Sequence, residues 1–379
     1  MPVNVERAIG NENLIIETGK LAHQAHGAVT VRLGDTIILA TAVMSEKPRS
    51  ADMDFLPMTV DFEERLYAAG KIPGSFFRRE GRPGQEAVLS CRLTDRALRP
   101  LFPKSLRNDI QITITVLSAD QEHPPDILGM VGASAALSMS QIPFSGPIGA
   151  SRLCYKEGQF TINPTYQEES DSQLSLVVAS TSDAIMMVEA GSDEVSEEII
   201  LEGIRRAHEA NLATIDLIEE LTNQVGKPKL TMPEVTNNAE GLNREIRDVL
   251  NGRLSALLDE NAEKIGREQA ENRLQEEVAE KLAEQYSPAQ IATGFKNVLK
   301  EEVRRRILEQ GVRPDGRGLA DIRPITCEVG VLPRTHGSGL FSRGLTQVLS
   351  TVTLASLSMN QKLDTLGPDG TKRFMHHYN

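Results

Sequence analysis

Two adjacent aromatic residues stand beside three arginines in one short stretch of the chain, Phe76-Phe77-Arg78-Arg79-Glu80-Gly81-Arg82-Pro83. Glycine and proline residues bracket this stretch on both sides, which is typical of a loop rather than of a helix or strand interior. Such a loop can hold a flexible polyanion, because guanidinium groups bind phosphates and exposed rings stack on unpaired bases, at about 1–3 kcal/mol per stacked base. The alternative is that both phenylalanines are core residues and the arginines pair with Glu64, Glu80 and Glu86. Residue types alone weigh these two interpretations evenly.

The chain is acidic overall but basic in one region. Its formal net charge is −12 at pH 7, which argues against a surface that coats nucleic acid along its whole area. Between residues 64 and 107, however, basic residues outnumber acidic ones: Arg65, Lys71, Arg78, Arg79, Arg82, Arg92, Arg96, Arg99, Lys104 and Arg107 stand against Glu64, Glu80, Glu86 and Asp95. A basic island on an acidic protein predicts a confined polyanion site, such as a channel or pore.

Length and composition indicate a folded protein of more than one domain. A chain of 379 residues predicts two or three domains, and 40% hydrophobic with 25% charged residues is typical of soluble globular proteins. No apolar run approaches membrane-spanning length, and the N-terminus has no signal-peptide pattern. The three cysteines are far apart, which argues against a disulfide framework or a zinc site, so a reducing cytosol is expected.

Hydrophobic periodicity predicts strands and helices in the first part of the chain. We expect a β-hairpin at 28–45, broken at Gly34-Asp35, and a half-buried strand at 110–118, where apolar and polar residues alternate. The other predicted elements are helices at 85–101, 126–140 and 193–222, and strands near 174–180 and 184–190. The first helix places Arg92, Arg96 and Arg99 on one face. The alternative is a solvated face on which Asp95 pairs with Arg99, and this alternative is favoured for at least one of the three arginines. Hairpins with helices packed on them predict an α+β fold.

Residues 243–310 change to a helical pattern, with apolar residues at helical spacing and dense charges between them. Ser287-Pro288-Ala289-Gln290 combines an N-cap serine, a proline at the first helical position and a glutamine three residues on. We expect this helix to stop at Gly311, with Arg304-Arg305-Arg306 in its last turn compensating the helix dipole. A small all-helical domain is therefore predicted.

The chain then repeats its own beginning. Glu17-x-Gly19-x-Leu21 matches Glu328-x-Gly330-x-Leu332, and after a one-residue slip residues 26–41 match 336–351 at a constant offset. Both copies have a strand–turn–strand rhythm, which indicates an internal duplication. The second copy stops at Asn379, well short of the first, so we expect a fragment of a longer protein.

No standard catalytic motif is present. Gly19-Lys20 is followed by leucine, so it is not a phosphate-binding P-loop, and Gly337-Ser338-Gly339 reaches Ser342 where a dinucleotide fingerprint needs glycine. There is no G-x-S-x-G serine elbow, and the seven histidines show no metal-ligand spacing. The residues alone predict polyanion binding on a duplicated α+β fold, without a reaction.

Four segments in chain order resemble the bacterial polynucleotide phosphorylase family: FFRREGRP (76–83), CRLTDRALRPLFP (91–103), RPDGRGLADIRPI (313–325) and HGSGLFSRGLTQ (336–347). The resemblance covers the whole chain. It implies a ribonuclease-PH-like core (ribosomal protein S5 domain 2-like) at 1–230, an all-helical domain at 231–310, and the truncated start of a second ribonuclease-PH-like core at 311–379. In that family, RNA-binding KH and S1-type domains follow.

The resemblance also implies a reaction and a set of RNA contacts. In the family, inorganic phosphate attacks the 3′ end of single-stranded RNA and releases nucleoside diphosphates, a reversible polyribonucleotide nucleotidyltransferase activity in mRNA turnover. Phe76, Phe77, Arg78 and Arg79 match the family's aperture loop, which grips single-stranded RNA, and Arg82 matches an arginine that lines the anion pocket of the related ribonuclease PH domain. This resemblance moves the even weighting of the loop toward RNA contact.

Catalysis is expected outside this chain. The family's active second domain uses a serine pair, two arginines, and aspartates plus a lysine beside Mg²⁺ or Mn²⁺, all of which we expect beyond Asn379. The matching positions of the first domain read Glu122-His123-Pro124-Pro125-Asp126 and Ser175-Leu176-Val177, without the serine pair or the D-x-K element. Without these groups phosphate attack lacks charge stabilisation, so the first domain is expected to guide RNA and not to cleave it.

The resemblance further implies a cytoplasmic enzyme that forms a homotrimeric ring, with degradosome partners and no membrane association. One alternative is a non-catalytic RNA-binding ring subunit that resembles exosome scaffold members. A weaker alternative is a ribosomal-type α+β RNA-binding protein, because the core topology is shared and fold alone does not determine function. The helical domain and the duplication count against this last interpretation.

Overall fold

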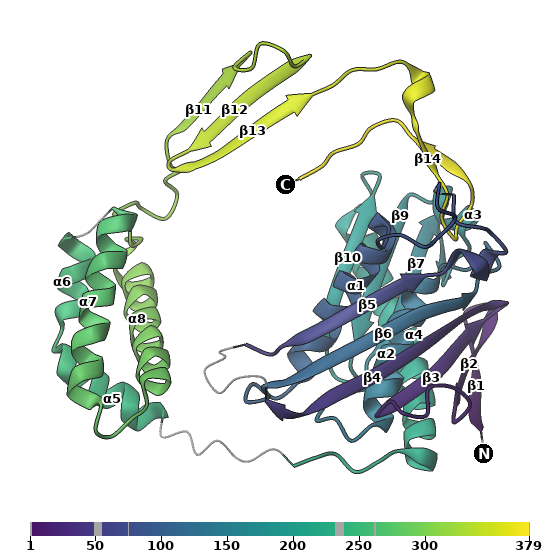
Figure 1. The fold of residues 1–379 in the computed structure, drawn as a ribbon, viewed down its shortest axis with the longest axis horizontal. Coiled ribbons are helices and arrows are strands. Elements are labelled where there is room, and N and C mark those ends of the chain that lie inside the picture. The colour runs from purple at the N-terminus through teal and green to yellow at the C-terminus, as the bar shows by residue number, and fades with distance from the viewer. Residues whose placement is uncertain (1, 49–54, 75, 232–238, 261–262, 379) are drawn as a thin grey trace. The chain divides into compact units, whose positions relative to one another are not determined.

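The computed structural model describes residues 2–48, 55–74, 76–231, 239–260 and 263–378 (Figure 1). The chain forms two compact units, one of residues 1–233 with 360–379 and one of residues 234–359. The predicted start of the helical domain at residue 231 adjoins residues 232–238, which lie outside the described part, so the three-part division of the chain stays a prediction. Among the described helices, none has the length and apolar character needed to span a membrane.

The first unit is built on a six-stranded sheet with the order β1-β2-β3-β4-β6-β5. Its strands are β1 Val3–Ile9, β2 Glu12–Thr18, β3 Gly27–Leu33, β4 Thr36–Pro48, β5 Met58–Glu64 and β6 Asn108–Ser118. All neighbours are antiparallel except the parallel pair β5 and β6. The predicted hairpin at 28–45 is confirmed as β3 and β4. The predicted strand at 110–118 is confirmed as β6, in which every second residue is buried along most of its length.

A four-stranded antiparallel sheet of the same unit has the order β10-β9-β7-β8. Its strands are β7 Gly149–Lys156, β8 Gln159–Ile162, β9 Leu174–Ser180 and β10 Ile185–Ser192. The predicted strands near 174–180 and 184–190 are confirmed as β9 and β10. The sequence did not predict β1, β2, β5, β7 or β8.

Helices pack on the six-stranded and the four-stranded sheet of the first unit. They are α1 Gln85–Leu98, α2 Pro125–Met139, α3 Tyr166–Ser170 and α4 Glu197–Val225, with the short 3₁₀ turns η1 Leu66–Ala69 and η2 Arg99–Leu101. The three longer helices confirm the predictions at 85–101, 126–140 and 193–222. α2 packs on β3, β4 and β6, whereas α4 packs on β7, β9 and β1.

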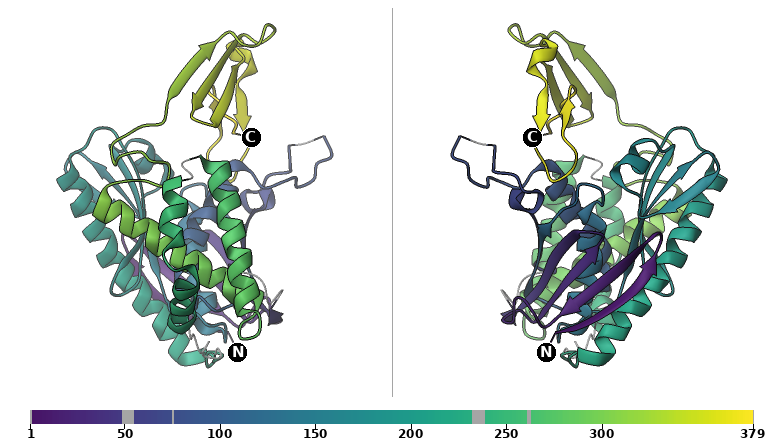
Figure 2. Two further views of the ribbon diagram at one scale, coloured as in Figure 1. Left: turned by 90° about the vertical axis from the view of Figure 1, so that its left-hand side faces the viewer. Right: turned by 90° about the vertical axis from the view of Figure 1, so that its right-hand side faces the viewer.

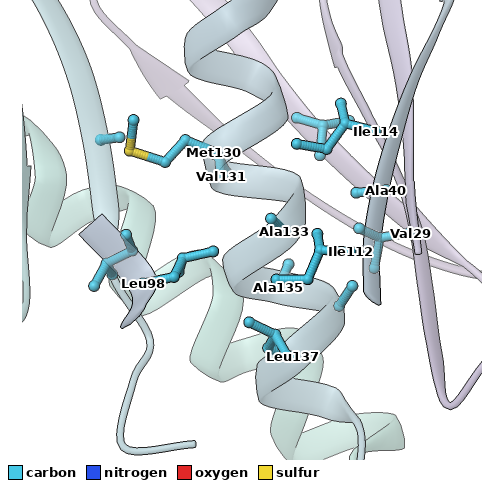
Figure 3. Close-up of a cluster of buried hydrophobic side chains, with 14 of the residues drawn as sticks. Val29, Ala40, Leu98, Ile112, Ile114, Met130, Val131, Ala133, Ala135 and Leu137 are labelled. Atoms are coloured by element: carbon cyan, nitrogen blue, oxygen red, sulfur yellow. The ribbon is translucent and has the colours of Figure 1, made fainter. Parts of the chain in front are cut away.

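The helix α2 lies at the centre of the first core, and all of its residues except Asp126 are buried. Gly132 permits its close approach to the sheet, because a Cβ at this position would lie 2.7 Å from Ile38 Cδ1 and 2.9 Å from Ala40 Cβ. Figure 3 shows Ala133 and Ala135 of this helix among apolar side chains of the surrounding elements. The small residues of α2 therefore serve close packing.

Residues 360–378 pack with the first unit. β14 Gln361–Leu363 pairs antiparallel with β15 Gly370–Lys372. Leu366, in the turn between these strands, is only 2% exposed and joins the hydrophobic core of the first unit. A segment far along the chain therefore contributes to the first core.

The second unit contains helices with a hydrophobic core of their own: α5 Ala239–Leu250, α6 Arg253–Glu260, α7 Lys264–Leu282 and α8 Pro288–Gln310. The predicted capping box of α8 is confirmed. The Ser287 hydroxyl accepts a hydrogen bond from the Gln290 N–H at 3.3 Å, and the Gln290 side chain accepts one from the Ser287 N–H at 2.9 Å. As predicted, α8 stops at Gly311, which has a left-handed φ of 67°.

The predicted role of Arg304–Arg306 was wrong, because α8 continues beyond them and its last turn contains no basic residue. Arg305 instead pairs with Glu302 at 2.8 Å. Arg306 is buried and forms an ion pair with Asp259 of α6. Arg306 therefore links α8 to α6, whereas Arg305 forms an exposed ion pair within α8.

The second unit continues into a three-stranded antiparallel sheet of β11 Ile325–Val329, β12 Gly337–Arg343 and β13 Thr346–Val352, followed by the turn η3 Leu357–Met359. Its register repeats that of β2 to β4: Gly27 pairs with Ala42 in the first copy, and Gly337 pairs with Val352 in the second. The internal duplication is therefore confirmed. Mostly antiparallel sheets with helices packed on them also confirm the α+β fold class.

Candidate nucleic-acid interface

The aromatic pair predicted to contact RNA is exposed on a loop. Phe76 is 94% and Phe77 is 84% exposed, and their rings meet edge to face with centroids 5.5 Å apart. The loop projects from the first unit in both views of Figure 2. The interpretation of these phenylalanines as core residues is therefore wrong, and their ring faces are open to a stacking partner.

The arginines that follow are exposed as well. Arg78 has a left-handed φ of 48°, which is uncommon for a residue other than glycine, and it turns the chain just after the aromatic pair. Within the described part of the chain, neither Arg78 nor Arg82 has a carboxylate partner. Arginine presents a planar fork of N–H donors that fits phosphate oxygens, so these side chains are suited to a phosphate backbone.

The base of the loop is fixed by hydrogen bonds. The Glu80 carboxylate accepts a hydrogen bond from the Leu66 N–H at 2.9 Å, and the Leu66 carbonyl accepts one from the Lys71 N–H at 3.0 Å. Gly70 ends η1 in a left-handed conformation with φ of 67°. Glu80 therefore anchors the loop to η1. The alternative interpretation had predicted that Glu80 pairs with an arginine.

A cavity of about 290 Å³ lies beneath the loop. Arg79 and Arg82 line it together with the carboxylates of Glu63, Glu64, Glu80 and Asp364. Burial and the charges of Glu86 and Asp126 raise the pKa of the Glu64 carboxyl above its ordinary value. The carboxylates that line this cavity attract the guanidinium groups of Arg79 and Arg82, which line it as well. That Arg82 binds an anion stays a prediction.

Three arginines of α1 and η2 line a separate cleft of about 780 Å³. Arg92, Arg96 and Arg99 share this cleft, so the prediction that they lie on one face is confirmed. Asp95 binds Arg99 through both carboxylate oxygens at 2.6 and 2.9 Å, and Arg96 pairs with Glu189 of β10. Two of these three arginines therefore serve the fold.

A half-buried charge cluster beside the same cleft was missed by sequence reasoning. Arg152 of β7 binds Asp126 and Glu169, each at 2.5 Å, and Glu169 also accepts a hydrogen bond from the Ser175 hydroxyl at 2.7 Å. Burial alone would lower the pKa of the Arg152 guanidinium. The negative charges of Asp126 and Glu169 outweigh this effect, so the pKa is raised above its ordinary value. Burial also raises the pKa of the nearby Tyr166 hydroxyl. The three charged residues come from separate elements, so no local spacing signals the cluster.

The positions matched to the family's catalytic elements have structural roles. Ser175 belongs to the ion-paired cluster, and Asp126 is bound by Arg152. His123 is buried, and its Nδ1 lies 2.7 Å from Asp120. Over the described ranges, no three His, Cys, Asp or Glu side chains come together in a group that could hold a metal ion.

The chain is similar to proteins of known sequence and, weakly, to a solved structure. A crystal structure of rice (Oryza sativa) Rrp46 shows a TM-score of 0.46 and 14% identity over 59% of this chain and 94% of that chain, a likeness too weak to bear on fold or function. Polyribonucleotide nucleotidyltransferases of Dehalococcoides mccartyi and Roseiflexus sp. are each 48% identical over 99% of this chain, and 52% and 51% of those proteins are covered. The chain thus spans about half the length of the curated relatives it matches.

Family models match the chain in order. The model of the 3′ exoribonuclease family, domain 1, matches residues 11–143 and 321–379, together just over half of the chain, and so covers both copies of the duplication. The model of domain 2 of that family matches residues 146–210, and the RNA binding domain of polyribonucleotide nucleotidyltransferase matches residues 241–318. Sequence reasoning predicted that residues 243–310 are helical, but it did not predict that this region matches an RNA binding domain. The chain therefore belongs to the 3′ exoribonuclease family, with ribonuclease-PH-like regions on either side of a helical one.

Proposed function

We propose that this chain is the RNA-guiding part of a polyribonucleotide nucleotidyltransferase. The whole enzyme would degrade single-stranded RNA processively from the 3′ end, with inorganic phosphate as the attacking group and nucleoside diphosphates as products, and would run in reverse at high diphosphate. The observation that carries the proposal for this chain is the exposed Phe76–Phe77 pair beside Arg78, Arg79 and Arg82 on a projecting loop. The names of the matched relatives support the reaction.

The loop has the two kinds of group that a single RNA strand requires. An exposed ring can stack on any base at about 1–3 kcal/mol per base, which suits a site that must accept every sequence. The guanidinium groups of the loop can bind successive phosphates, and this binding weakens as salt rises because counterions are released. The remainder of the chain is acidic, so RNA would be attracted to this loop rather than to the surface at large.

We assign catalysis to residues outside the described part of this chain. Ser175 and Asp126 stand where the family places catalytic elements, and both belong to the Arg152 ion-pair cluster. The two carboxylates already compensate the positive charge of Arg152, which weakens its attraction for a phosphate oxygen. The Mg²⁺ or Mn²⁺ of the family is proposed for the whole enzyme only, as are assembly into a homotrimeric ring, degradosome partners and a cytoplasmic location.

The test of the RNA site is binding of poly(A) to the 379-residue chain at one fixed salt concentration. Replacing Phe76 and Phe77 together with alanine should weaken binding about tenfold or more, because two stacking surfaces are lost. Phe374→Ala is the matched control, since it also removes an exposed ring with an edge-to-face partner but lies outside the loop. Equal affinity of the wild type and the double variant would contradict the proposed site.

The test of the reaction is release of nucleoside diphosphates from poly(A) and phosphate. The protein encoded by the complete reading frame should release nucleoside diphosphates, whereas the 379-residue chain alone should not. Release by the chain alone would show that the first domain is catalytic. RNA binding without release by the complete protein would favour the non-catalytic ring subunit.

A further inference from the structure

The hairpin of β14 and β15, residues 361–372, contacts the base of the Phe76–Arg82 loop, and we name it the brace hairpin. Lys71 lies just before the loop, and its ammonium group donates to the Thr365 carbonyl at 3.0 Å and to Asp369 at 2.8 Å. Thr365 and Asp369 lie 294 and 298 positions after Lys71 in the chain. The contact therefore joins a segment from the second copy of the duplication to the loop of the first.

The brace hairpin also reaches the other end of the loop. Lys372 of β15 donates to the Gln85 side chain at 3.2 Å, and Gln85 is the first residue of α1, directly after the loop. Asp364 approaches the chain before the aromatic pair, since a Cβ on Gly74 would lie 2.8 Å from its carboxylate. Both ends of the loop are thus held by one hairpin.

The hairpin is anchored by burial. Leu366 at its turn is almost fully buried in the core of the first unit, and the next residue, Gly367, lies against the Tyr166 ring. Asp364, Thr365 and Leu366 also line the cavity beneath Arg79 and Arg82. A buried anchor between two polar contacts makes the hairpin a fixed support.

We propose that the brace hairpin positions the Phe76–Arg82 loop for RNA, with Lys71, Leu366 and Asp369 as positioning residues that do not touch RNA themselves. The inference rests on the proposed RNA-binding function of the loop. The exposed tip has little packing of its own, so its conformational freedom is limited mainly by how its two ends are held. A loop that is held before binding loses less entropy on binding RNA and therefore binds more tightly.

Asp369→Asn provides the sharpest test, because two explanations predict opposite signs. If Asp369 acted only through its charge, removing a negative charge near an RNA site would strengthen binding. If it positions the loop by holding Lys71, binding of poly(A) at fixed salt should weaken about threefold to tenfold. Trypsin should also cleave faster after the exposed arginines of the loop, whereas the melting temperature should stay unchanged.

Two further variants complete the series in the 379-residue chain. Leu366→Ala removes the buried anchor and should weaken RNA binding and speed loop cleavage in the same way. Lys156→Ala is the matched control. Lys156 makes an exposed ion pair with Asp171, at an N–O distance of 3.5 Å, and this pair lies outside the loop and the brace hairpin. The variant should leave both cleavage and RNA affinity as in the wild type.

The outcomes separate this inference from the function on which it rests. If the wild type does not bind poly(A), or binds it no better than the Phe76 and Phe77 double variant, the proposed function fails. If the double variant is impaired but Asp369→Asn binds as well as or better than the wild type, with unchanged loop cleavage, the brace is overturned.

Discussion

The two copies of the duplicated hairpin have the same backbone but different burial. β3 and β4 pair in the same register as β12 and β13, and their turns use Gly34 and Gly344 at nearly equal φ of 57° and 59°. Ile38 in the first copy is fully buried, whereas Val348 at the corresponding position of the second is 46% exposed. Turn and register therefore follow from local sequence, but burial depends on what packs on the strands.

The helix α2 accounts for the difference. In the first copy it packs on β3 and β4, with Gly132 close to Ile38. The second copy has apolar residues at matching positions, including Phe341 and Val352, and both are exposed. Within the described part of the chain, the second copy thus has the sequence of a packed sheet without a helix that buries it.

The largest effect that tests this comparison is cavity formation in one copy only. Ile38→Ala should lower the free energy of unfolding of the first unit by about 2–5 kcal/mol, because a buried side chain is truncated beneath α2. Val348→Ala, its matched control, should change stability by no more than about 0.5 kcal/mol. Urea unfolding followed by circular dichroism, with amide exchange to identify the unit, measures both. Equal losses would show that the second copy is packed as tightly as the first.

A smaller effect concerns the threonine after each turn. The Thr36 hydroxyl is buried and donates to Asp120 at 3.0 Å, whereas Thr346 is exposed and has no such carboxylate among the described residues. Thr36→Val should destabilise the first unit by about 1–3 kcal/mol, since Asp120 loses a hydrogen bond. Thr346→Val should leave stability unchanged. A matching loss from the second variant would mean that its hydroxyl also has a buried partner.

The same network makes the first copy sensitive to acid. Burial alone would raise the pKa of Asp120, but hydrogen bonds from the N–H and ring of His123, from the Glu122 N–H and from Thr36 hold it well below its usual range. The stabilisation is therefore present above the unfolded carboxyl pKa of about 3.9 and is lost as pH falls through the lower folded value. Asp120→Asn should lower the melting temperature at pH 7, and its deficit relative to the wild type should shrink below about pH 4. A deficit that stays constant down to pH 3 would contradict this assignment.

Local patterns predicted the elements that local sequence specifies. The alternation of β6, the turn at Gly34 and the Ser287 capping box all depend on residues within a few positions of each other. The parallel pairing of β5 with β6 joins strands separated by α1, and no short-range pattern encodes it. Leu366 packs in the first core although it is still farther along the chain from the other residues of that core, so short-range patterns do not encode this contact either.

The candidate site shows the same limit. Glycine and proline residues predicted the loop, but the exposure of Phe76 and Phe77 could not be predicted, because phenylalanine serves cores as readily as stacking surfaces. The Arg152 cluster and the contact of Lys71 with Asp369 combine residues from distant segments. Side chains that act as a group only after folding leave no spacing signal in the sequence.

The smallest predicted effect concerns a contact that both copies share. His26 Nδ1 accepts a hydrogen bond from the Met44 N–H at 3.3 Å, and His336 Nδ1 accepts one from the Leu354 N–H at 2.9 Å, so each histidine holds its hairpin at the same place. One such bond contributes about 0.5–1.5 kcal/mol, so His26→Ala or His336→Ala should speed exchange of the facing amide by about two- to tenfold. Because the contact is local, the two factors should be similar despite the difference in burial. Faster exchange at Met44 with no change at Leu354 would show that even this contact depends on packing by α2, and local sequence would then specify less of the hairpin than its register suggests.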